Sequence, residues 1–333
     1  LVALLLAPLG VLEPSGRGAL LAALVRFPAL TSGFAAFTAS ASQLLPLATF
    51  CVRLPLVAGC FPCGPRALSS ALLVTVALAS GAAAASPSAS FLLLVRTCGL
   101  VPAPLLVLGP SGPPFLPSSV RNAGAPPFRP TAPRPVRPIC RTMLIWALVT
   151  SPLLVLGGLA PHHCHSLCHA PSRAPPAPWG GPRLPGDRCP VPQMAMAGFL
   201  PFSAIYIELY YIFASIWGHK IYTMASILFI VFIILIIVTA FVTVALTYFQ
   251  LAVEDHEWWW RSVLCGGSTG IFIFFYCIYY YHARSDMSGF MQTSFFFGYM
   301  TCVCFGFFLM LGTVGFRASL FFVRHIYRSI KCE

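Results

Sequence analysis

The stretch that decides the fold is IYTMASILFIVFIILIIVTAFVTVALTYF, residues 221–249. It contains no charged residue and no proline. About 20 consecutive apolar residues are enough for an α-helix to cross the hydrocarbon core of a bilayer. A buried helix of a large soluble protein is the alternative, but further apolar runs of similar length follow within a few residues. The stretch therefore predicts a membrane-spanning helix.

The composition of the whole chain agrees with that prediction. Of its 333 residues, 58% are hydrophobic and only 8% are charged, and the mean hydropathy is +0.84. One soluble core of this size could not bury so much apolar surface. We therefore predict an all-α fold, a polytopic bundle of transmembrane helices.

Residues 194–333 predict a bundle of four spans. The expected spans are 196–217, 221–249, 263–282 and 290–316, and an extension of the last span past Arg317 to Val323 is left open. The connectors between them are short, so that consecutive spans must run antiparallel.

The first half of the chain has a different composition, rich in Ala, Leu, Pro, Ser, Gly and Val. Residues 1–142 form a poorly defined apolar and proline-rich region with possible divergent spans. Residues 143–193 combine a short span, 143–160, with a proline-rich cytosolic loop. Prolines at the density found in 109–142 and 161–193 predict extended or disordered segments.

The basic residues predict the orientation of the bundle. If the C-terminus is cytosolic, seven basic residues of the connectors and tail face the cytosol and two face the opposite side, which favours this orientation over its inverse. The seven are Arg173, Arg183, Arg188, Arg261, Arg324, Arg328 and Lys331, and the two are Lys220 and Arg284. These residues form no basic face, so nucleic acid is not an expected partner.

The segment EDHEWWWR, residues 254–261, lies between the second and third spans. Tryptophans suit the lipid headgroup layer, carboxylates stay in water, and an arginine can pair with carboxylates or with lipid phosphate. We therefore expect an interfacial loop at the cytosolic surface of the bilayer. Its residues are Glu254, Asp255, Trp258, Trp259, Trp260 and Arg261.

Several motifs from Gly198 onward resemble, in order and spacing, the end of the nonaspanins, the transmembrane 9 superfamily. They are GFLPFSAIYIELYYIFASIWGHKIY, LTYFQLAVEDHEWWWRSVL, FFFGYM, LMLGTVGF and FVRHIYRSIKCE. The three tryptophans resemble the member-1-like branch. The family usually has Glu-Asp-Tyr-x-Trp where this chain has His256 and Glu257, which affects only the expected packing of the loop.

The resemblance covers roughly 196–333 and is thinner upstream, where 18–37, 100–112 and 148–160 resemble family spans only faintly. One hypothesis is that part of residues 1–190 is a divergent or mispredicted translation. We expect the chain to carry the membrane part of a nonaspanin without the large luminal N-terminal domain.

The resemblance also implies a function. Nonaspanins are multispanning proteins of Golgi and endosomal or lysosomal membranes that help other membrane proteins to reach their proper membrane, with links to adhesion, phagocytosis and autophagy. The partners that the resemblance implies are transmembrane clients and the COPI coat, in addition to the lipid bilayer itself.

Glu208 lies midway along the predicted span 196–217. An ionised carboxylate at that depth costs about 2.5–3.5 kcal/mol on insertion scales unless it is paired or protonated, so it should face the bundle interior. It could couple transport of a proton or substrate, or recognise polar groups of client spans. The alternative is a structural carboxyl that is hydrogen-bonded to Tyr222 or to a backbone carbonyl.

Two further patterns have a functional and a structural interpretation. The segment HHCHSLCH, residues 162–169, has ligand types that suit zinc or copper, but its spacing fits no established finger and we predict no metal site there. Gly266 and Gly270 are spaced to let helix backbones approach closely, either for client spans or for internal packing.

The cysteines within the spans are expected to be small buried hydrophobes. No catalytic triad, phosphate-binding loop or dinucleotide fingerprint is present, so we expect neither an enzyme nor a cofactor. The remaining alternatives to sorting are a transporter or channel-like protein that uses Glu208, and a structural membrane component without specific clients.

The terminal residues Lys331 and Glu333 resemble the family's retrieval signal for COPI, which offers a lysine, an acidic side chain and a terminal carboxylate to a cytosolic receptor. We predict that Lys331→Ala combined with Glu333→Ala shifts the protein out of the early Golgi, measured by its colocalisation with compartment markers. An unchanged distribution would count against the signal.

Overall fold

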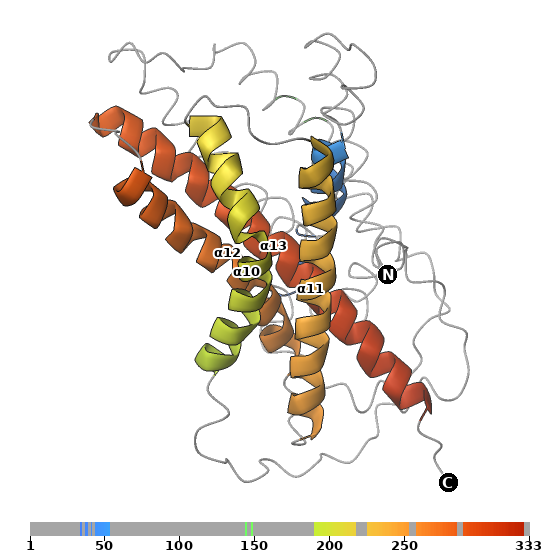
Figure 1. Cartoon of the computed structure of the whole chain (residues 1–333). Coiled ribbons are helices and arrows are strands. Elements are labelled where there is room, and N and C mark those ends of the chain that lie inside the picture. The colour runs from blue at the N-terminus through green and yellow to red at the C-terminus, as the bar shows by residue number, and fades with distance from the viewer. Residues whose placement is uncertain are drawn as a thin grey trace. The chain divides into compact units, whose positions relative to one another are not determined.

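The computed structural model describes the C-terminal part of the chain and scattered residues before it. The described residues are 34, 37, 38, 41, 44–53, 144, 148, 190–217, 225–252, 258–284 and 289–329. Within them the regular structure is helical, without a strand, as the all-α prediction requires. The four long helices in Figure 1 are α10 (Pro190–Trp217), α11 (Ala225–Ala252), α12 (Trp258–Arg284) and α13 (Phe290–Ser329).

Each of these helices is long and apolar enough to cross a bilayer. The qualifying segments are Val191–Ser215, Ser226–Ala252, Trp258–Arg284 and Gln292–Val323. The four spans expected between 196 and 316 are therefore confirmed as helices of spanning length. A shorter apolar helix, Leu44–Arg53, lies in the first half of the chain.

The helix boundaries differ from the expected ones at the polar and proline-rich ends. Helix α10 begins at Pro190 rather than at 196, because a proline in the first turn of a helix removes no hydrogen bond that the helix needs. The last four residues of the segment 161–193, predicted to be extended, are thus helical. Pro190 and Pro192 both lie in the first turn of α10, and Pro201 lies in its interior.

The connector expected at 250–262 is also shorter. Helix α11 continues to Ala252 and α12 starts at Trp258, so the aromatic residues of the expected loop form the first turn of a helix. Helix α13 continues past Arg317 to Ser329, beyond the extension to Val323 that was left open. Polar side chains near a span end do not by themselves end a helix.

The described residues fall into two compact units. Unit 1 contains α10, α11, residues 258–269 of α12 and 310–329 of α13, together with Phe34. Unit 2 contains residues 270–284 of α12, Gly289, residues 290–309 of α13 and the described residues from 37 to 148.

In unit 1, buried threonines line one side of α11. Thr239, Thr243 and Thr247 are at most 2% exposed, and each hydroxyl donates to the carbonyl four residues earlier. The hydroxyl of Thr247 also lies 2.8 Å from that of Ser319 on α13. A side chain that satisfies itself on its own helix and bonds across to another is a common means of joining helices in membranes.

In unit 2, α12 and α13 are joined by a glycine contact and by a side-chain hydrogen bond. A Cβ atom added at Gly270 would lie 2.8 Å from the carbonyl oxygen of Cys304 and 2.8 Å from the amide nitrogen of Phe308. Further along the pair, the hydroxyls of Tyr281 and Thr293 are 3.0 Å apart. The two helices therefore run antiparallel and touch backbone to backbone at Gly270.

Gly270 and Gly306 provide a matched test of this packing. We predict that Gly270→Ala destabilises the protein by about 1–3 kcal/mol, because the added methyl group meets backbone that cannot move aside cheaply. Gly306→Ala adds a methyl group with nothing within 4 Å, so it should be neutral or stabilising by up to about 1 kcal/mol. Thermal unfolding of both variants in detergent measures the difference, and equal midpoints would contradict the contact.

Candidate functional site

Glu208 lies at the edge of the buried face of α10. Ile205 and Leu209 on that face are buried, whereas Ile207 and Tyr211 are exposed. Because side chains three and four apart share a helix face, the half-buried Glu208 stands between the packed face and the outer one. It is the one acidic residue within the described ranges. Tyr222, its suggested partner, falls outside those ranges.

The outer face of α10 around Glu208 is exposed, aromatic and aliphatic. Tyr206 is 45% exposed, Ile207 65% and Tyr211 39%. Helix α10 packs along α11, and its buried side includes Ile205, Leu209 and Phe213. A carboxyl group in mid-span thus borders a surface that unit 1 itself does not cover.

The three tryptophans of the expected interfacial loop are packed against protein to different extents. Trp258 and Trp259 are 3% and 2% exposed, and their rings stack on each other with centroids 4.7 Å apart. Trp259 also packs against Phe316 at 5.5 Å and against Phe34 at 5.9 Å. Protein side chains therefore surround Trp258 and Trp259, and their level at the headgroup layer stays a prediction. Trp260 is half-buried.

The aromatic cluster formed by the three tryptophans and Phe316 in unit 1 also includes Phe34, from the first half of the chain. Phe34 is 1% exposed and meets Trp260 and Phe316 edge to face, with centroids 5.1 Å and 5.0 Å apart. Edge-to-face pairs of this kind are favourable beyond the area that they bury. Phe34 was not among the expected site residues, although Phe34, Phe37, Thr38 and Ala41 follow helical spacing, which is a signal of a packed helix face.

The other residues of the expected interfacial loop are only partly described. Arg261 is half-buried in the second turn of α12. Glu254 and Asp255 lie outside the described residues, as do the tail residues Lys331 and Glu333 and the segment 162–169. Within the described ranges, no group of three or more His, Cys, Asp or Glu side chains is placed to hold a metal ion.

Gly266 and Gly270 both serve packing within the chain. In unit 1, a Cβ atom at Gly266 would lie 2.6 Å from the carbonyl oxygen of Leu311 and 3.3 Å from the Cα atom of Gly312. In unit 2, Gly270 meets α13 in the same way. Both glycines thus face α13 of the same chain, which is the internal-packing alternative.

The thiols within the spans are buried as expected, and two of them meet. Cys265, Cys277 and Cys304 are buried and Cys302 is half-buried, and all four are thiols rather than disulfides. The sulfur atoms of Cys277 and Cys304 are 4.0 Å apart. Sequence analysis did not pair them, because their pairing depends on the register of α12 against α13, which no local pattern reveals.

Comparisons with known proteins identify the family that this chain resembles. The model of the family described as Endomembrane protein 70 matches residues 130–290. A protein of Arabidopsis thaliana named Transmembrane 9 superfamily member 4 is 74% identical over 176 residues, which are 53% of this chain and 30% of that protein. The C-terminal part of this chain is similar to the transmembrane 9 superfamily.

Two further transmembrane 9 relatives, one from Mus musculus and one from Arabidopsis thaliana, match as well. Member 1 of Mus musculus is 54% identical over 159 residues, 48% of this chain and 25% of the relative. Member 3 of Arabidopsis thaliana is 72% identical over 176 residues. The chain thus spans less than a third of the length of the relatives that it matches. No solved structure matches it.

The family match begins earlier than the motifs suggested. The motifs that resemble the family lie within 196–333, whereas the match to the Endomembrane protein 70 model starts at residue 130. It therefore includes the apolar segment 143–160 and the proline-rich segment 161–193.

Trp259 tests the aromatic cluster. Truncation of a packed tryptophan costs about 3–5 kcal/mol in well-packed cores, so we predict a large loss of stability for Trp259→Ala. Phe321→Ala is the matched control, because this aromatic residue of unit 1 is 48% exposed and its loss should cost under about 1 kcal/mol. Thermal unfolding in detergent compares the two. A Trp259→Ala variant as stable as the control would show that Trp259 contacts lipid rather than a protein cluster.

Proposed function

We propose that this protein assists the sorting or membrane localisation of other membrane proteins by binding their spans sideways, at the outer face of α10. The observation that carries the proposal is the position of Glu208. Its carboxyl group borders the exposed residues Ile207 and Tyr211 in mid-span, where a neighbouring helix could reach it through the bilayer.

The physical basis is the cost of polar groups in hydrocarbon. A polar or basic residue in a client span is costly when it faces lipid, and a hydrogen bond to Glu208 would reduce that cost. The same hydrogen bond would also stabilise Glu208. Tyr206 and Tyr211 add aromatic surface and hydroxyl groups on either side of the carboxyl. Such a surface would select spans by a polar residue at matching depth.

The location and orientation form part of the proposal. The family match supports a protein of the endomembrane system, and we propose the Golgi and endosomal or lysosomal membranes, with links to autophagy. The distribution of Arg and Lys over the connectors favours a cytosolic C-terminus. In that orientation, Lys331 and Glu333 would be available to the COPI coat for retrieval.

Transport through the bundle is the second candidate, since an intramembrane carboxyl is typical of proton-coupled transporters. Proton relays generally use several titratable groups in sequence. Glu208 is the one acidic residue in the described part of the chain, and its exposed neighbours favour a position near lipid over one within a protein-lined path. The position of Glu208 therefore favours lateral recognition.

Glu208→Gln separates the two functions. Glutamine keeps the shape and the hydrogen-bonding capacity but removes the charge and the exchangeable proton. We predict that in cells depleted of the protein, clients with a basic residue in mid-span leave their proper membrane. Re-expressed wild type should restore them, and Glu208→Gln should restore them at most partly. Surface proteomics of the depleted and rescued cells measures the effect.

A proton-flux assay in proteoliposomes tests the transporter alternative. Proteoliposomes that contain the wild-type protein should show no proton flux above empty vesicles. Flux that is present in wild type and lost in Glu208→Gln would support a transporter and contradict the sorting proposal. Ser203→Ala on the exposed face of α10 is a control that should leave client localisation unchanged, because its hydroxyl is already bonded to the carbonyl of Leu200.

A further inference from the structure

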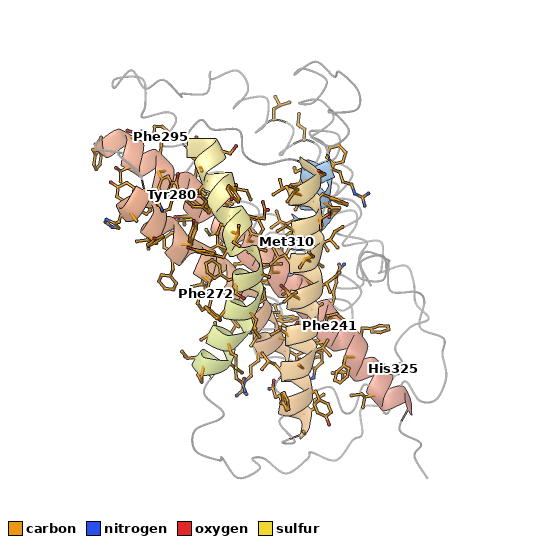
Figure 2. All side chains as sticks on the ribbon, viewed as in Figure 1. Phe241, Phe272, Tyr280, Phe295, Met310 and His325 are labelled. Carbon is orange, nitrogen blue, oxygen red and sulfur yellow. The ribbon has the colours of Figure 1, made fainter. Side chains whose placement is uncertain are left out.

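Two buried thiols meet between α12 and α13 in unit 2. Cys277 is 0% exposed and Cys304 is 5% exposed, and their Sγ atoms are 4.0 Å apart. Figure 2 labels Phe272 and Tyr280 on α12, and Cys277 lies between these two residues in the sequence. Both residues lie within the candidate spans, so the pair is enclosed by protein at membrane depth.

The register of the two helices also puts a methionine in the stretch of α13 that faces Cys277. Gly270 of α12 lies against Cys304 and Phe308 of α13, and Tyr281 bonds to Thr293. Because the helices are antiparallel, the residues of α13 opposite Cys277 lie between these two contacts. Met300 falls in that interval, precedes Cys304 by one helical turn and is 8% exposed. Residues four apart share a helix face.

The spacing of the thiols fits a metal centre. Metal–thiolate bonds are about 2.3 Å long, and three sulfurs at that distance in a plane around one ion stand about 4.0 Å apart. The thiols of Cys277 and Cys304 already have this separation. A disulfide would require the sulfurs to approach to about 2.05 Å, so the observed spacing suits a bridging ion without movement of the backbone.

The ligand types select the ion. Thiolate and thioether sulfur are soft ligands that favour Cu⁺ over hard cations such as Mg²⁺ or Ca²⁺. Zn²⁺ in closed protein sites takes four ligands, and three sulfurs leave it one short within the described residues. A three-sulfur site in an apolar surrounding therefore matches Cu⁺.

We propose that Cys277, Cys304 and Met300 form an intramembrane binding site for Cu⁺. One thiolate neutralises the charge of the ion, and each thiol that binds as thiolate releases its proton to water. No electron transfer is involved, because copper enters and stays as Cu⁺. Release of protons on binding means that the affinity for Cu⁺ rises with pH.

The test is an anaerobic Cu⁺ titration of the full chain in detergent. Cu⁺ is supplied as its acetonitrile complex in competition with a chromogenic Cu⁺ chelator. The background carries Cys164→Ser and Cys168→Ser, because the segment 162–169 also has soft ligands. We expect Cys277→Ser with Cys304→Ser to lose one bound equivalent, and Met300→Leu to weaken binding at least tenfold. Cys302→Ser and Cys265→Ser are the matched cysteine controls and should keep it.

A second measurement needs no substitution at the site. In wild type, Cu⁺ should protect Cys277 and Cys304 from alkylation by N-ethylmaleimide, mapped by mass spectrometry, at least tenfold more than it protects Cys302. Equal protection of all three thiols would overturn the proposal, as would an unchanged stoichiometry in the double variant. A pair that oxidises to a disulfide but binds no Cu⁺ would overturn it too.

Discussion

The structure depends on the absence of water from the hydrocarbon core of the bilayer. Backbone amide and carbonyl groups in that layer have to bond within their own segment, which leaves long helices as the available form. Helices α10, α11, α12 and α13 meet this requirement over spans that contain few charged residues. Even Pro190 and Pro201 are accommodated within α10.

The same constraint determines how the helices hold together. Lipid is as apolar as a leucine side chain, so burial alone does not drive helices together, and close packing and hydrogen bonds have to do so. The protein uses three devices: glycines that let backbones touch, at Gly266 and Gly270, hydroxyls that bond across helices, as in Thr247 with Ser319, and stacked rings around Trp259. Polar groups outside these devices, Glu208 above all, are therefore the strongest candidates for recognition.

The spans could be predicted from the sequence, because hydrophobicity over 20 residues is a local property. The ends of α11, α12 and α13 could not, because a helix can continue through polar residues such as Gln250 and Arg317. For the candidate site, Glu208 stood out from the sequence as a carboxyl in mid-span, but its place at the edge of a packed face required the contacts of Ile205 and Leu209. The burial of Trp258 and Trp259 required Phe34 and Phe316, which are distant in sequence. The pairing of Cys277 with Cys304 likewise required the register of two helices.

The most direct test of the four-span topology is to measure on which side of the membrane each connector lies. The variants His256→Cys and Ser285→Cys are each treated with a membrane-impermeant maleimide in sealed microsomes. Their labelling is compared with that of the unsubstituted chain. Four spans with a cytosolic C-terminus predict that His256→Cys is labelled in intact vesicles and Ser285→Cys only after permeabilisation. Labelling of both positions from one side would show that α12 does not cross the bilayer, and would contradict the account.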